Sequence, residues 1–196
     1  MQTNHQLIKT NHQLLNENFF IPNWEVKYLL LGTFNPEGGA PVAYFYGRNR
    51  NRTWELLSNI FNVELHPNND NFFELIQSLG IACMDMIMTV EANDKDTQYI
   101  LGRGYSDPKI INGKVLRIYN TQNIIDVINA NPKLTVFSTW GKGQTLKEWQ
   151  HEINEIRQEK VIIPLVSPSM VARVPAGAEK FQYMLTDWRT KININD

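Results

Sequence analysis

The chain has 196 residues, a formal net charge of −1, and 42% hydrophobic against 20% charged residues. This composition is typical of a globular protein with a sizeable core, and it provides no overall positive field for a polyanion. Any nucleic-acid site must therefore be a local patch. The single cysteine, Cys83, excludes an internal disulfide and any four-cysteine zinc or iron–sulfur site.

The first 22 residues contain a short repeat, because Thr-Asn-His-Gln-Leu at 3–7 recurs at 10–14. The period of seven would place Leu7 and Leu14 on one helical face, so residues 1–22 are expected to form a docking helix or an irregular arm. His12 is expected on an exposed polar face rather than at a metal. Residues 23–196 are expected to form a single domain. Because this segment has no apolar h-region, no signal peptide is expected, and the expected location is the cytoplasm.

Apolar runs alternate with amphipathic segments along the rest of the chain. Four runs predict strands at about 25–32, 81–90, 134–139 and 161–166. The segments between and after them predict helices at about 51–61, 71–79, 121–130, 145–158 and 179–191. This alternation predicts an α/β fold with right-handed crossovers, a three-layer α/β/α sandwich around a mainly parallel sheet of about four strands.

Three of these strands end in small or glycine-rich turns, which are Gly32-Thr33, Thr139-Trp140-Gly141 and Ser167-Pro168-Ser169. Because the carboxyl ends of parallel strands lie along one edge of a sheet, we expect a composite pocket there.

Two other features bear on that pocket. The loop at 33–47 is unusually aromatic for a solvated linker, since it carries Phe34, Tyr44, Phe45 and Tyr46. Asp85 lies in a run rich in Met and Ile, and it is either a functional carboxylate or a structural cap or partner of an arginine.

Four motifs together resemble signatures of the uracil-DNA glycosylase superfamily. Gly32-Thr33-Phe34-Asn35-Pro36 is similar to the family's strand that ends in Gly and leads into Asn-Pro. Arg50-Asn51-Arg52-Thr53-Trp54 is similar to a helix start found in the mismatch-specific and hypoxanthine-directed branches. Residues 136–142 resemble the mid-chain strand and turn, and Ser167-Pro168-Ser169-Met170 resembles the C-terminal signature. The motifs follow the family's order across about residues 26–190.

The resemblance implies a uracil-DNA glycosylase-like fold and a monofunctional DNA glycosylase of base-excision repair. Such an enzyme hydrolyses the N-glycosidic bond of a deaminated or mismatched base, here uracil, hypoxanthine or thymine in a mismatch, without a metal or cofactor. The implied partner is double- or single-stranded DNA with a damaged base, bound by a monomer near the nucleoid, with no membrane partner. The extra residue between Gly32 and Asn35, and Ser167 where the family often has His, point to the mismatch-specific or hypoxanthine-directed branches.

The resemblance also implies roles for individual residues. Asn35 or Asn51 would orient the attacking water. The other roles fall into three groups: base binding by Gly32, Thr33, Phe34, Phe45, Tyr46, Ser167 and Ser169, phosphate contacts by Arg48, Arg50, Arg52, Lys142 and Arg173, and a duplex wedge at Met170 or Val171.

Two alternatives remain open from the sequence. The same fold can serve as a catalytically weak or inactive module that binds nucleic acid or a nucleotide. An α/β enzyme acting on a small nucleoside or another metabolite is the other alternative, because the net charge is not basic.

Overall fold

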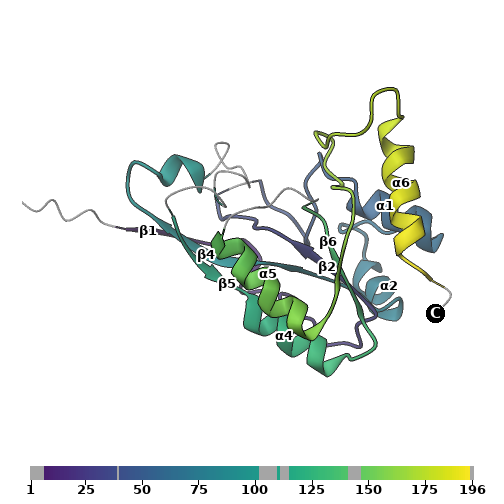
Figure 1. Cartoon of the computed structure of the whole chain (residues 1–196), viewed down its shortest axis with the longest axis horizontal. Coiled ribbons are helices and arrows are strands. Elements are labelled where there is room, and N and C mark those ends of the chain that lie inside the picture. The colour runs from purple at the N-terminus through teal and green to yellow at the C-terminus, as the bar shows by residue number, and fades with distance from the viewer. Residues whose placement is uncertain (1–6, 39, 102–109, 111–114, 141–146, 195–196) are drawn as a thin grey trace, which may run out of the picture.

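The computed structural model describes residues 7–38, 40–101, 110, 115–140 and 147–194 (Figure 1). Its centre is a four-stranded sheet in the order β3-β2-β6-β7, in which every pair of neighbours is parallel. The strands are β2 (Tyr28–Gly32), β3 (Ile81–Asp85), β6 (Thr135–Ser138) and β7 (Ile162–Pro164). The predicted parallel sheet of about four strands is therefore confirmed.

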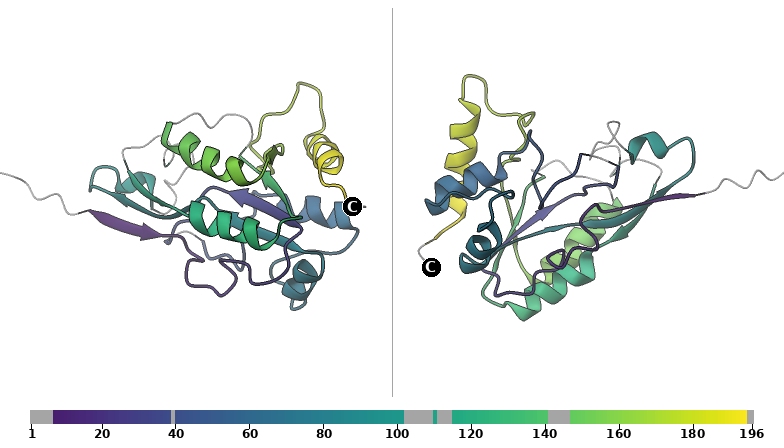
Figure 2. Two further views of the ribbon diagram at one scale, coloured as in Figure 1. Left: turned by 60° about the horizontal axis from the view of Figure 1, so that its bottom comes forward. Right: turned by 180° about the vertical axis from the view of Figure 1, so that it is seen from behind.

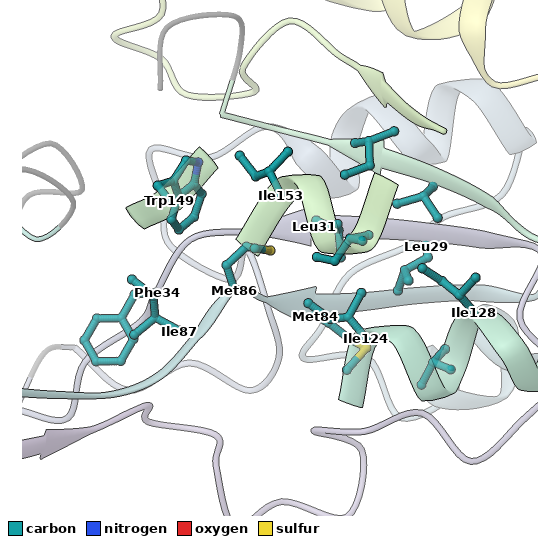
Figure 3. Packing of buried hydrophobic residues seen from close by; sticks show 14 of the residues in the cluster. Leu29, Leu31, Phe34, Met84, Met86, Ile87, Ile124, Ile128, Trp149 and Ile153 are labelled. Atoms are coloured by element: carbon teal, nitrogen blue, oxygen red, sulfur yellow. The ribbon is translucent and has the colours of Figure 1, made fainter. Parts of the chain in front are cut away.

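Helices cover both faces of this sheet, on opposite sides of it in Figure 2. Leu29 and Leu31 of β2 pack with α4 (Thr121–Ala130) and α5 (Lys147–Glu159) (Figure 3). Leu30 points the other way and packs with α1 (Thr53–Phe61), α2 (Phe72–Ser78) and α6 (Lys180–Lys191). Successive side chains of a strand alternate between faces, so a strand covered on both faces must be apolar throughout. Burying each of these leucines contributes about 1.5–3 kcal/mol.

A second, antiparallel sheet has the order β1-β4-β5. Its strands are β1 (Ile8–Asn11), β4 (Ile87–Ala92) and β5 (Leu116–Tyr119), and a short 3₁₀ helix (Thr97–Tyr99) follows β4. Only Met86 separates β3 from β4, so the chain passes directly from one sheet to the other. The single strand predicted at 81–90 is thus two strands, and β5 was not predicted at all.

The N-terminal segment differs from the helix considered for it. Ile8–Asn11 is strand β1, paired with β4, so a helix through Leu7 and Leu14 is wrong. The backbone then runs beside the loop after β2, where His12 forms a bridge with Pro36 and Gln13 N–H donates to the Asn35 carbonyl at 2.7 Å. The expectation of an exposed His12 is also wrong, because only 1% of the residue is accessible.

Within the described ranges, no helix combines the length and the apolar content needed to cross a membrane.

Candidate functional site

A pocket of about 400 Å³ opens at the carboxyl edge of the parallel sheet. It lies at β2, which has β3 on one side and β6 on the other. The chain runs from β2 to β3 on the first side and later returns to β6 on the second side, so its direction across the sheet reverses at β2. Such a switch point is where open α/β sheets place their ligands, and this volume falls within the range of about 300–1,000 Å³ typical of small-molecule sites.

The pocket brings together most of the residues that the sequence nominated. The nominated residues that line it are Gly32, Thr33, Phe34, Asn35, Tyr46, Arg48, Arg50, Asn51, Ser167, Ser169 and Val171. Four others, Phe45, Arg52, Met170 and Arg173, are not among its lining residues. Lys142 lies outside the described residues. The loops after β2 and β7 therefore meet at one place, together with Thr139 and Trp140 after β6.

Two of the residues outside the lining have other contacts. Phe45 is buried in the core, its ring lies 5.5 Å from the ring of His12, and its carbonyl accepts the indole N–H of Trp54 at 2.8 Å. Arg52 forms an ion pair with Glu55 at 2.6 Å and lies over the ring of Phe181. Phe45 therefore packs in the core and offers no surface on which a base could stack. Arg52 lies between α1 and α6.

Asn51 joins two of the site loops and starts α1. Its side-chain oxygen accepts the backbone N–H of Thr53 at 2.8 Å, which satisfies one of the free donors at the beginning of the helix. Asn51 also forms an isolated antiparallel bridge with Ser169, and Met170 N–H donates to the Arg50 carbonyl at 2.9 Å. One lone pair of the amide oxygen is thus engaged in structure.

Asp85, at the end of β3, is the only acidic residue among the described residues that line the pocket. Its side chain is 9% exposed, and His12 Nε2 lies 2.8 Å from its Oδ2. The backbone N–H of Leu14 donates to His12 Nδ1 at 3.1 Å, so the ring carries its proton on Nε2 and donates it to the carboxylate. The partner of Asp85 is therefore a histidine, not an arginine.

The carboxylate lies directly over Gly32. The two residues are register partners of β2 and β3, and a Cβ at position 32 would overlap Asp85 Oδ1 and approach the Tyr46 hydroxyl to 2.9 Å. Glycine is required here for space, because its backbone φ is not positive.

Tyr46 closes the same corner of the pocket. Its φ of 57° is rare for a bulky residue, and such strain persists where the surroundings hold the residue in place. The Thr139 hydroxyl donates its hydrogen to the Leu31 carbonyl at 3.1 Å, so it accepts from the Tyr46 hydroxyl, also at 3.1 Å. The ring is thereby fixed against the end of β6.

The rim supplies charge and apolar surface. Arg48 and Arg50 line the pocket, and the loop after β7 exposes 44% of Met170 and 75% of Val171. Cys83 lies inside the sheet, where burial first and the charge of Asp85 second raise the pKa of its thiol, which makes it a poor nucleophile. Among the described residues, no three His, Cys, Asp or Glu side chains are grouped to hold a metal ion.

No protein-family model matches the chain, and no curated protein matches it significantly. The pocket itself is therefore the main evidence of function.

Proposed function

We propose that the chain is a DNA glycosylase that hydrolyses the N-glycosidic bond of a deaminated or mismatched base, with uracil, hypoxanthine and mismatched thymine as candidates. The observation that supports this most is the convergence, on one pocket of about 400 Å³, of the loops whose motifs resemble the uracil-DNA glycosylase superfamily. An enzyme that acts on a base must take it out of the helix into such a pocket.

The chemistry of the pocket suits this reaction. Cleavage places positive charge on the sugar and negative charge on the leaving base, so it needs stabilising charges and a positioned water. Asp85 supplies negative charge, and Asn35 lines the same pocket as a candidate to orient the water. An amide is a weak base, so modest rates are expected. The proposal requires no metal or cofactor.

The rim suits a DNA strand. Arg48 and Arg50 line the pocket and provide local positive charge in a chain of net charge −1, and in this proposal they contact the phosphates. Met170 and Val171 are exposed apolar residues on the adjoining loop, as a wedge between base pairs would be. With DNA as substrate, we place the protein in the cytoplasm near the nucleoid, as a monomer.

A second candidate is a binding module of the same fold that does not hydrolyse. The engagement of the Asn51 side-chain oxygen by Thr53 N–H favours it, because that amide is then less available to a water.

The test uses oligonucleotides, single-stranded and duplex, that contain uracil, hypoxanthine, xanthine or mismatched thymine, with undamaged duplex as control. Alkali-sensitive strand breaks at the modified base are expected. Salt-sensitive binding without any break at excess protein supports the binding module, and the absence of both binding and breaks contradicts both candidates.

A further inference from the structure

We infer that Gln13, in the N-terminal segment, is a positioning residue for the reaction, because it holds the loop that carries Asn35. This loop, residues 35–42, is called the β2 loop below. The inference rests on the proposed function, since it takes Asn35 to orient the attacking water. Gln13 belongs to the second copy of the repeated pentapeptide, at 10–14, which none of the glycosylase-like motifs includes. The N-terminal segment thereby contributes to catalysis as well as to folding.

The segment around Gln13 lies between the antiparallel sheet and the β2 loop. On one side, the His12 N–H donates to the Met88 carbonyl at 2.7 Å, next to the pairing of β1 with β4. On the other side, His12 forms the bridge with Pro36, and the neighbouring N–H of Gln13 donates to the Asn35 carbonyl at 2.7 Å. A residue before proline favours an extended backbone, which suits Asn35 to this pairing. The β2 loop is therefore attached to the antiparallel sheet through the N-terminal segment.

The side chain of Gln13 ties the two limbs of the β2 loop together. Its Oε1 accepts the Val42 N–H at 2.8 Å. Its Nε2 donates to the Ala40 carbonyl at 3.3 Å and to the Pro36 carbonyl at 3.5 Å. Among the described residues, every hydrogen bond between the β2 loop and the rest of the chain involves Asn11 or Gln13.

Packing contributes little to the tip of the β2 loop. Glu37, Gly38, Ala40 and Pro41 are exposed, and a Cβ on Gly38 would meet no described atom within 4 Å. Gly38 has a φ of +78°, so the chain turns there at a residue with few conformational limits. Hydrogen bonds from the N-terminal segment therefore hold this tip, and both ends of the loop line the pocket.

Asn35 has the more available amide of the two asparagines that line the pocket. Its side chain has no hydrogen-bond partner among the described residues, whereas the side-chain oxygen of Asn51 accepts the Thr53 N–H. The backbone of Asn35 is instead held through its carbonyl by Gln13. Because a displacement of about 1 Å at a positioning group can reduce a rate by about a hundredfold, loosening the β2 loop should slow cleavage.

The first experiment changes only the side chain of Gln13. Q13M keeps its length but cannot form the hydrogen bonds of the amide, whereas Q13E keeps an acceptor for the Val42 N–H and loses the donor to the Ala40 carbonyl. Single-turnover cleavage of the best substrate should fall by about tenfold to thirtyfold in Q13M and by about threefold in Q13E. Affinity for a fluorinated analogue of the same nucleotide, which resists cleavage, should stay within about twofold, because the arginines of the rim are unchanged.

A double-mutant cycle tests whether Gln13 acts through Asn35. Q13M should slow cleavage by at most about twofold in an N35A background, because the group that Gln13 positions is already gone. In an N51A background, it should slow cleavage as much as in the wild type. Q77M, at an exposed glutamine of α2, is the matched control and should cleave as the wild type does. Thermal unfolding identifies any variant that fails to fold.

Cleavage by Q13M at the wild-type rate overturns the inference. An equal loss from Q13M in the wild-type and N35A backgrounds also overturns it, because such a loss reflects a general change of structure. Both results leave the glycosylase proposal standing. If N35A cleaves too slowly to measure, the order of rates among the wild type, Q13E and Q13M and the unchanged affinity are the test. A loss of affinity as large as the loss of rate refutes a positioning role, and a wild-type protein that cleaves no substrate overturns both this role and the glycosylase proposal.

Discussion

The two ends of the parallel sheet each carry a cavity, and the larger one is the less promising site. The cavity at the amino ends measures about 800 Å³, against about 400 Å³ at the carboxyl ends. Two of its polar side chains are engaged by the fold: Lys191 donates to the Pro164 carbonyl at 2.7 Å, and Asn131 accepts the N–H of Val26 at 2.9 Å. The smaller pocket instead holds a nearly buried carboxylate with one oxygen over Gly32.

This difference shows that side-chain chemistry, rather than volume, identifies the site. At the amino ends, polar side chains form hydrogen bonds to the backbone of the same fold. At the carboxyl ends, a charge and a strained tyrosine are held in place at some cost to stability, as functional groups often are. Each end also contains a glycine with a side chain packed over it, Gly32 under Asp85 and Gly80 under Lys27.

The glycine pair provides the strongest test of the comparison. G32A should reduce cleavage by at least about a hundredfold, because the new methyl displaces the Asp85 carboxylate from its position. G80A should instead lower stability by about 1–2 kcal/mol, since Gly80 has a φ of +69°, and the folded protein should cleave normally. Urea unfolding measures the stability of each variant, and single-turnover cleavage measures its activity. Full activity in G32A would refute the placement of the site.

The exposed cations at the two ends should differ in their contribution to DNA binding. R50A should weaken binding to all sequences and reduce the slope of log K against log salt by about 1, because one phosphate contact is lost. K133A, at the rim of the amino-end cavity, should leave both unchanged. Fluorescence anisotropy over a range of salt concentrations measures these slopes. Equal effects of the two variants would mean that the carboxyl edge does not bind the strand.

The carboxyl edge could be predicted from the sequence because its signals are local. An apolar run that ends in Gly32, and another that ends before Ser167-Pro168-Ser169, identify strand ends, and parallel strands bring such ends together. The helices could be predicted for the same reason, since α1 and α4 carry apolar residues at helical spacing.

The His12–Asp85 pair could not be predicted, because 73 residues separate its members. His12 is followed by polar and apolar residues without a clear period, and it reaches the site through the pairing of β1 with β4 and its own bridge with Pro36. The break between β3 and β4 was hidden for another reason: the run is apolar on both sides of Met86, so no change of pattern marks the change of sheet. Phe45 was misjudged because the turn at Tyr46, with its φ of 57°, decides which ring faces the pocket.

Removal of a tyrosine hydroxyl at either end of the sheet should have a smaller effect on cleavage. Y46F removes the hydrogen bond to Thr139 at 3.1 Å, and cleavage should fall by roughly threefold to tenfold as the corner of the pocket loosens. Y28F removes the hydrogen bond to the Asn193 carbonyl at 3.1 Å, beside the amino-end cavity, and should change only the midpoint of thermal unfolding. A larger loss of cleavage in Y28F than in Y46F would reverse the assignment of the two ends.

The smallest expected effect is on thermal stability, and it concerns α6, the helix that supports the carboxyl edge. The carboxylate of Glu179 accepts the N–H groups of Phe181 and Gln182 at the start of α6, and Lys180 donates to the Met170 carbonyl in the site loop. These hydrogen bonds to Gln182 and then Phe181 lower the pKa of Glu179 from its ordinary value of 4.5.

Since the folded pKa is the lower one, the stabilisation is present above pH 4.5 and is lost as the pH falls through the folded value. E179Q should therefore unfold at a slightly lower temperature than wild type at neutral pH, and the difference should shrink in acid. E64Q, which removes an exposed carboxylate from the segment between α1 and α2, is the control. A difference between E179Q and wild type that does not change with pH would show that the ionised carboxylate does not stabilise the start of α6.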